Sequence, residues 1–244
     1  MRLVVFICAR NEEPTIGEVV ASTLSVAESA AETVRVLLVD DSSDDGTAAA
    51  ARAAGATVVP VASGSGLANA FNIGVRAALA RDASHLAHID ADNQYSASAL
   101  LDLIASVHAG ADLVVGDRLS SRPEGMSDIR YAWNRHLSEL VSLLAGAPVR
   151  DSQSGCRVFS RQVAEAFDIT SAFTYTQEQI IRTVRNGFRV EQVPIWFGPR
   201  QSNHSRLVRT PLDYLARVFH DLSSLADEYG VDLEHVRFYR EPIE

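Results

Sequence analysis

The feature of this sequence that most constrains its fold is a regular alternation of short apolar runs with helical segments over the first half of the chain. Runs such as Leu3–Ile7 are continuously apolar, which is typical of strands buried on both faces. Apolar residues at helical spacing separate these runs. This β-α alternation predicts an α/β fold with a Rossmann-like, mostly parallel central sheet and helices on both faces.

Apolar periodicity and turn residues place the individual elements. Pro14 suits the first turn of the first helix, Asp44 or Asp45 could cap the second helix, and Gly55 ends it. Strands are predicted over residues 3–7, 34–39, 56–61, 85–89, 113–115, 155–159 and 188–193. Later helices are predicted over residues 67–81, 98–109, 129–144, 176–186 and 211–229. The length of 244 residues fits a single domain, expected over residues 1–230, with a tail over 231–244.

Charge and cysteine content exclude several classes of protein. The formal net charge is −9, so the chain lacks the basic surface that nucleic-acid binding requires. All 22 basic residues are Arg, so any cation that binds a phosphate here is a guanidinium. Cys8 and Cys156 match no metal-binding spacing and are expected to be buried free thiols. No signal peptide follows Met1, and no run approaches the roughly 20 apolar residues of a membrane span, which favours a cytoplasmic protein.

Polar clusters follow the predicted strands of the first half. Parallel sheets bind their ligands at the carboxyl ends of the strands, so these clusters are expected to converge on one rim. Four of the five carry charged groups and one is rich in Gly. The clusters are Ala9-Arg10-Asn11-Glu12, Asp40-Asp41, Ser63-Gly64-Ser65-Gly66, Asp90-Ala91-Asp92 and Gly116-Asp117-Arg118.

The cluster after the fourth strand suits a metal ion. Asp90 and Asp92 are one residue apart, so both carboxylates can approach one hard divalent cation, and Gln94 could supply a neutral oxygen. Such a cation would bind diphosphate oxygens and stabilise a departing phosphate. An isolated Asp-x-Asp is more often a capped turn, so the prediction depends on the neighbouring clusters.

The second cluster favours nucleotide binding. Carboxylates at the end of a second strand accept hydrogen bonds from ribose hydroxyls or a base N–H in other nucleotide-binding α/β folds. Asp40 and Asp41 precede the predicted cap position and are assigned to ligand binding. Asp44 and Asp45 are assigned to the helix cap instead.

Five ordered motifs resemble those of family 2 glycosyltransferases of the GT-A fold, most nearly the dolichyl-phosphate mannosyltransferase-like, or polyprenyl-phosphate glycosyltransferase, group. The resemblance spans residues 3 to about 160, with weaker similarity from Arg200 to Arg206. The motifs are Ala9-Arg10-Asn11-Glu12-Glu13, Val39 to Thr47, Gly66-Leu67-Ala68-Asn69-Ala70, Asp90-Ala91-Asp92-Asn93-Gln94 and Asp151 to Phe159.

The resemblance implies an inverting, metal-dependent hexosyltransferase that uses a nucleotide-sugar donor. Residues 1–118 would form the donor half and residues 119–230 the acceptor half. The implied donor-binding residues are Ala9, Arg10, Asn11, Glu12, Asp40, Asp41, Gly66, Asn69, Asp90 and Ala91. The implied metal ligands for Mg²⁺ or Mn²⁺ are Asp90, Asp92 and Gln94. The implied catalytic residues are Asp92, Asp151 and Arg118, and the acceptor-side residues are Arg118, Arg135, Arg200 and Arg206, with Arg130 an alternative to Arg135.

The sequence leaves three hypotheses about function open, and two of them differ in the acceptor. An acceptor phosphate, as in polyprenyl phosphate, is already ionised and needs Arg forks to position it. A hydroxyl of a soluble acceptor, for example in secondary metabolism with a UDP-sugar such as UDP-GlcNAc, would need a carboxylate base, for which Asp151 is the candidate. Asp151 could equally make a structural contact to Arg157 or to backbone. A non-catalytic nucleotide-sugar-binding protein is the third hypothesis, which the intact Asp90, Asp92 and Asp41 disfavour.

Two departures from the group's pattern lie on the acceptor side. Tyr95-Ser96 stands where the group usually carries His-Pro, and the late loop, Arg200 to Arg206, lacks the usual Gly before Ser-Lys. The helix over 211–229 is amphipathic, but its polar face is acidic, which favours core packing or a homodimer contact over a membrane surface. Attachment to the inner face of the membrane remains an option. The sequence names neither the base nor the sugar of the donor.

Overall fold

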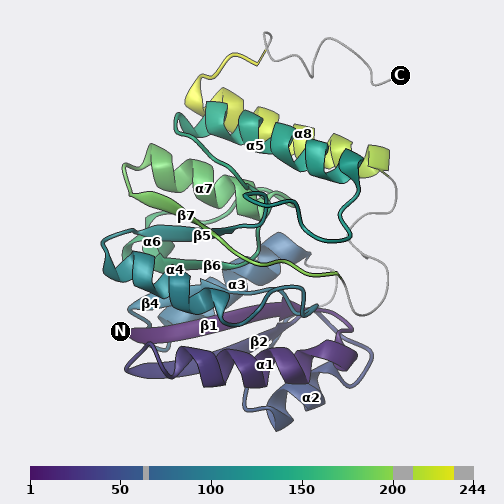
Figure 1. Cartoon of the computed structure of the whole chain (residues 1–244), viewed down its shortest axis with the longest axis vertical. Helices are drawn as coiled ribbons and strands as arrows, with labels where there is room; N and C mark the ends of the chain where they lie inside the picture. The colour runs from purple at the N-terminus through teal and green to yellow at the C-terminus, as the bar shows by residue number, and fades with distance from the viewer. Residues whose placement is uncertain (63–65, 200–210, 234–244) are drawn as a thin grey trace.

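A seven-stranded mixed sheet forms the centre of the protein (Figure 1). The computed structural model describes residues 1–62, 66–199 and 211–233. Within these ranges the strand order is β3-β2-β1-β4-β6-β5-β7. The strands are β1 (Arg2–Ala9), β2 (Thr33–Asp40), β3 (Thr57–Pro60), β4 (His85–His88), β5 (Leu113–Asp117), β6 (Arg157–Ser160) and β7 (Val190–Pro194).

One strand breaks the parallel pattern. β6 lies between β4 and β5 and runs antiparallel to both, while the pairs β1–β2, β1–β4, β2–β3 and β5–β7 are parallel. Arg157 pairs with His88 on one side and with Val115 on the other. The predicted mostly parallel sheet is therefore confirmed, and the carboxyl ends of β1, β2, β4 and β5 share one edge.

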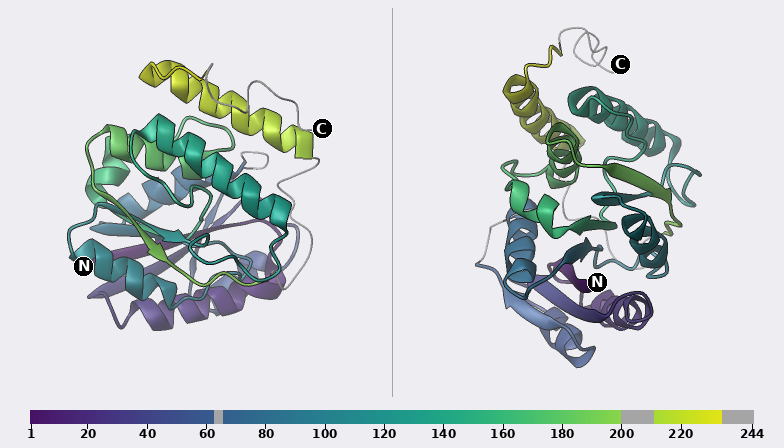
Figure 2. Two further views of the ribbon diagram at one scale, coloured as in Figure 1. Left: turned by 45° about the horizontal axis from the view of Figure 1, so that its top comes forward. Right: turned by 90° about the vertical axis from the view of Figure 1, so that its left-hand side faces the viewer.

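Helices cover both faces of the sheet, as predicted (Figures 1 and 2). The helices α1, α2 and α4 bury their apolar residues on one face, and α3, α5, α6 and α7 on the other. The helix bounds are α1 (Glu13–Ala27), α2 (Thr47–Ala53), α3 (Leu67–Leu79), α4 (Ala99–His108), α5 (Asp128–Ala145), α6 (Arg161–Ala166), α7 (Tyr175–Arg185) and α8 (Pro211–Tyr229).

The last helix, α8, lies beside α5, farthest from β1–β3 (Figure 1). Its apolar side chains Val218, Leu222 and Leu225 are buried in the core, which confirms core packing as its use. The buried carboxylate of Asp221 accepts hydrogen bonds from the backbone N–H groups of Phe173 and Thr174, just before α7. No helix in the described residues is both long and apolar enough to cross a bilayer.

Several predicted details are wrong. The predicted strand over 155–159 begins only at Arg157, because the preceding residues form a polar turn. Helix α6 was not predicted, since its six residues are too few to show a helical period. The N-cap of α2 is Gly46, not Asp44 or Asp45; the Asp45 carboxylate nevertheless accepts the Thr47 N–H. Cys8 and Cys156 are buried free thiols, as predicted.

Candidate active site at the carboxyl edge of the sheet

The loops after β1 and β2 are tied together at the sheet edge. The Asp41 N–H donates to the Ala9 carbonyl at 2.9 Å, and the Asn11 N–H donates to Ser43 Oγ at 2.9 Å. The Asp44 N–H donates back to Asn11 Oδ1 at 2.7 Å. The structure therefore brings the predicted donor residues Ala9–Glu12 and Asp40–Asp41 together, and leaves Asp40 and Asp41 half-buried rather than committed to the core.

Strained backbone is concentrated in these loops. Asn11, Ser42 and Asn93 adopt φ values of 55°, 59° and 57°, in the left-handed region that residues other than Gly rarely adopt. Each lies in the segment that follows a parallel strand, and the segment after β4 is held to α1 by the hydrogen bond from Thr15 Oγ1 to the Ala91 carbonyl, at 2.7 Å. Such strain persists where surrounding contacts over-determine the backbone, which is frequent at functional sites.

Asp90 and Asp92 lie shortly after β4, which ends at His88, and both are half-buried. The Asp92 carboxylate accepts the Gln94 N–H at 3.3 Å. The Asp90 carboxylate lies against the backbone of Gly155, where a Cβ would overlap it. Burial raises the pKa of the Cys8 thiol near the end of β1, and the carboxylates of Asp90 and Asp41 raise it further.

The segment after β7 lies across this motif. The Gln94 side-chain amide donates to the Gly198 carbonyl at 2.8 Å, and the Gly198 N–H donates to the Gln94 carbonyl at 2.9 Å. Beside this pair, the rings of Tyr95 and Phe197 meet edge to face at 5.0 Å between centroids. The segment therefore fixes the residues immediately after the Asp90–Asp92 pair, and Gln94 is buried there.

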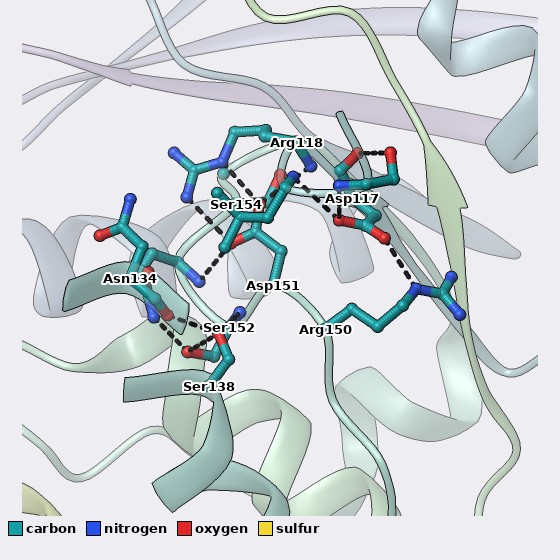
Figure 3. Close-up of polar contacts among 12 residues, drawn as sticks. Asp117, Arg118, Asn134, Ser138, Arg150, Asp151, Ser152 and Ser154 are labelled. Carbon is teal, nitrogen blue, oxygen red and sulfur yellow. Dashed lines mark hydrogen bonds and ion pairs between the residues drawn. The ribbon is translucent and has the colours of Figure 1, made fainter. Parts of the chain in front are cut away.

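Two consecutive ion pairs join the end of β5 to the segment before β6 (Figure 3). In the first, Arg150 Nε donates to the Asp117 carboxylate at 2.7 Å. In the second, Arg118 donates to the Asp151 carboxylate through Nε at 2.7 Å and Nη2 at 2.9 Å. The Asp151 carboxylate also accepts the backbone N–H groups of Arg118 and Gln153. Asp151 is fully buried. Of the two structural contacts considered from the sequence, the one to backbone is present through the Gln153 N–H, whereas the side-chain partner is Arg118 and not Arg157.

The environment of Arg118 stabilises its charge. Burial opposes the charge, but Asp151, Tyr95 and Asp90 outweigh burial and raise the pKa of the guanidinium above its ordinary value. The guanidinium also stacks over the Phe197 ring at 5.0 Å. Arg118 is thus a fixed cation electrostatically coupled to the Asp90 motif, and no described residue hydrogen-bonds its Nη1 group.

Helix α5 presents one polar face to the same segment. Ser138 Oγ accepts the Ser152 N–H at 3.0 Å, and Asn134, one turn earlier, is buried. Arg130 lies one further turn earlier and so shares this face, because residues four apart are neighbours on a helix. Arg130 and Arg135 are both exposed, and Arg135 lies on a different face of α5.

The remaining predicted residues fall at the rim or outside the described chain. Gly66 is exposed, with a φ of 78° that favours Gly, and Asn69 is exposed in the first turn of α3. Arg10 is exposed at the end of β1, beside the half-buried Glu12. Arg200 and Arg206, Ser63 to Ser65, and residues 234–244 of the predicted tail lie outside the described residues.

Sequence reasoning missed several residues of this site. Tyr95 accepts the Gly155 N–H at 2.9 Å, Phe197 stacks under Arg118, and Arg150 pairs with Asp117. Tyr95 stood out only as a departure from a family pattern. Phe197 had a weak signal, since Ile195 and Phe197 alternate with the exposed Trp196. Nothing in the sequence marked the pairing of Arg150, which spans 33 positions.

The loops after β1 and β2, the Asp-Ala-Asp turn and the buried Arg118 lie at one edge of the sheet, as the resemblance to GT-A glycosyltransferases led us to expect. The family model "Glycosyl transferase family 2" matches residues 4–167, more than half of the chain. The chain therefore belongs to glycosyl transferase family 2.

Similar proteins agree with this assignment. A dolichyl-phosphate hexose transferase of Haloferax volcanii is 31% identical over 191 residues, covering 78% of this chain and 80% of the relative. A polyprenol monophosphomannose synthase of Mycolicibacterium smegmatis is 30% identical over 221 residues, covering 84% and 81%. The crystal structure of glucosyl-3-phosphoglycerate synthase from Mycobacterium tuberculosis with Mn²⁺, UDP-glucose and phosphoglyceric acid is similar at a TM-score of 0.71 and 20% identity, covering 100% of this chain and 87% of that one. This likeness confirms the GT-A fold.

Proposed function

We propose that this protein is an inverting hexosyltransferase that moves a sugar from GDP-mannose or a UDP-hexose to a polyprenyl-phosphate-type acceptor. By their names, one of the relatives reported above is a dolichyl-phosphate hexose transferase and another makes polyprenol monophosphomannose. The observation that carries the proposal for this chain is the environment of Asp151. Its fully buried carboxylate is held by Arg118 on both oxygens, so the hydroxyl-acceptor alternative lacks its candidate base.

The donor half, residues 1–118, holds the nucleotide-sugar. The loops Ala9–Glu12 and Asp40–Asp41 bind base and ribose, and Gly66 and Asn69 border the same edge. The convergence of the first two loops through backbone hydrogen bonds supports this assignment. The left-handed Gly66 leaves open space where a side chain would stand, so the protein backbone there could approach the nucleotide closely.

Asp90 and Asp92 suit a divalent metal ion, Mg²⁺ or Mn²⁺. Mg²⁺ is usually bound through one or two carboxylates together with substrate phosphates, and two half-buried carboxylates one residue apart match that donor set. Gln94 joins them only through its amide oxygen, because its amide nitrogen donates to Gly198. When bound, the ion would stabilise the negative charge that develops on the leaving diphosphate.

The acceptor phosphate needs positioning rather than deprotonation. One of its oxygens attacks the anomeric carbon of the sugar while the bond from that carbon to the nucleoside diphosphate breaks. Arg118 orients this phosphate with its Nη1 group, and Asp151 positions Arg118. Arg130 is the second phosphate-binding residue in preference to Arg135, because Arg130 shares the α5 face that contacts Ser152. Arg200 and Arg206 belong to the same acceptor half, residues 119–230.

A lipid acceptor requires contact with a membrane surface. Among the described residues of the acceptor half, three large apolar side chains are exposed: Ile129 at 84%, Trp196 at 60% and Leu143 at 47%. The two most exposed, Ile129 and Trp196, are sequence neighbours of Arg130 and Phe197. Trp is enriched where proteins meet the bilayer interface. We propose peripheral attachment through these residues, and loss of vesicle binding in an Ile129→Ser/Trp196→Ser variant that retains nucleotide binding is the expected result.

The decisive experiment is a transfer assay with matched acceptors. Radiolabelled GDP-mannose and UDP-hexoses are incubated with Mn²⁺ and either polyprenyl phosphate or the same polyprenol without its phosphate. We expect transfer to the phosphate alone, abolished by Asp92→Asn. Transfer to the free alcohol, or to soluble hydroxyl acceptors, would contradict the proposed acceptor. Binding of a nucleotide-sugar without turnover on any acceptor would contradict an enzymatic function altogether.

A further inference from the structure

Arg157 is the largest fully buried side chain in the described residues, and the proposed reaction gives it no role. It begins β6, the antiparallel strand between β4 and β5, and is followed by the apolar Val158 and Phe159. Within the described chain no carboxylate lies within ion-pair distance of it. A guanidinium buried without an anion costs several kcal/mol. An apolar side chain such as Met or Leu would fill this part of the core without the cost of burying a charge. The guanidinium of Arg157 therefore needs another explanation.

The guanidinium of Arg157 joins two segments through neutral oxygens. Nη1 donates to the Thr176 carbonyl at 3.1 Å and to Gln179 Oε1 at 2.7 Å, both in α7. Nη2 donates to the Ser154 carbonyl in the turn before β6. The guanidinium makes these bonds from two separate nitrogens in one plane, whereas an ammonium group carries its three N–H donors on a single nitrogen and cannot reproduce this geometry.

The peptide next to Ser154 supports the Asp90 carboxylate. His88 Nδ1 lies 2.7 Å from the Gly155 carbonyl, and Tyr95 Oη accepts the Gly155 N–H at 2.9 Å. Gly155 is the residue whose missing Cβ leaves room for Asp90. Three buried side chains, those of Arg157, His88 and Tyr95, therefore fix the backbone against which Asp90 rests.

We propose that Arg157 is a positioning residue for the metal motif: its buried guanidinium fixes the Ser154–Gly155 backbone to α7 and thereby sets the position of the Asp90 carboxylate. This inference rests on the proposed metal role of Asp90. Groups that orient metal ligands from behind commonly change metal affinity by 10- to 100-fold when they are replaced. Burial lowers the pKa of Arg157, but an Arg remains charged in proteins, so the fork geometry persists at neutral pH.

The test measures Mn²⁺ binding by the electron paramagnetic resonance signal of free Mn²⁺, with UDP and with GDP in separate titrations. Arg157→Met and Arg157→Lys are compared with the wild type, and thermal unfolding verifies that each variant is folded. We expect both variants to raise the Kd for Mn²⁺ about 10- to 100-fold. Arg182→Met is the matched control, because Arg182 is another poorly exposed Arg whose partners, Glu178 and Glu228, lie away from the motif. It is expected to lose stability and keep its Mn²⁺ affinity.

The outcomes separate this inference from the proposed function. A folded Arg157→Met variant with wild-type Mn²⁺ affinity would overturn the inference, and so would full rescue by Arg157→Lys, which keeps the charge without the fork. Where Arg157→Met does not fold, Gln179→Met decides, since it removes one partner only: raised Kd supports the inference and an unchanged Kd refutes it. Asp90→Asn tests the proposed metal role of Asp90, on which the inference rests. Wild-type affinity in that variant would refute the metal site itself, whatever Arg157 does.

Discussion

Replacing Asp151 by Asn tests whether this carboxylate is the buried counterion of Arg118. Asp151 is fully buried and the Arg118 side chain is 6% exposed, so solvent does not screen the pair. Asp151 accepts three hydrogen bonds from Arg118, between 2.7 and 3.0 Å, and one from the Gln153 N–H at 3.1 Å. Removing one partner of such a pair leaves the other charge buried and uncompensated, which costs about 3–5 kcal/mol. We expect the free energy of unfolding, measured in urea at neutral pH, to fall by that amount.

A second variant and a surface control sharpen this test. Arg118→Met/Asp151→Leu removes both charges and is expected to recover most of the lost stability, because apolar replacement of a buried pair is often neutral or stabilising. Glu165→Gln breaks the exposed i,i+4 pair with Arg161 and is expected to cost only about 0.3–0.5 kcal/mol. A loss below about 1 kcal/mol in Asp151→Asn, or a double variant no more stable than the single one, would refute the buried-pair argument.

Three further predictions concern the metal motif, the loss of stability at acidic pH and the binding of the acceptor. Gly155→Ala should displace the Asp90 carboxylate and weaken Mn²⁺ binding at least about tenfold, as calorimetry would show. Gly17→Ala in α1 should not, because its added Cβ would make only a van der Waals contact with the Ala50 carbonyl, at 4.0 Å. Burial opposes ionisation of Glu178, but hydrogen bonds from Ser171, Thr170 and Arg182 outweigh it and lower its pKa. Its stabilisation is therefore present above the ordinary carboxyl pKa of about 4.3 and lost as the pH falls through the folded value. Melting temperature should consequently fall less steeply below pH 5 in Glu178→Gln; an unchanged slope would disprove this. Arg130→Ala should raise the KM for polyprenyl phosphate at least about tenfold and Arg135→Ala should not, and the reverse order would assign the phosphate to Arg135.

Local periodicity accounts for the parts of the fold that the sequence predicted. Continuous apolar runs such as Leu3–Ile7 identify strands buried on both faces, and the amphipathic spacing of α8 predicted its bounds, Pro211–Tyr229. Strand order could not be obtained this way. β6 is only four residues long, and its insertion between β4 and β5 depends on pairings more than 40 positions apart in the sequence.

The sequence by itself determined which residues meet at the carboxyl edge of the sheet, because parallel strands deliver the residues after them to one edge. Ala9–Glu12, Asp40–Asp41 and Asp90–Asp92 followed from that rule. Only the tertiary structure decided what Asp151 and Arg157 do. Both lie in one short polar motif, yet Asp151 pairs with Arg118 and Arg157 bonds α7. Residue spacing carries no information on which distant partner a buried charge meets, since that depends on how β5, β6 and α7 pack together.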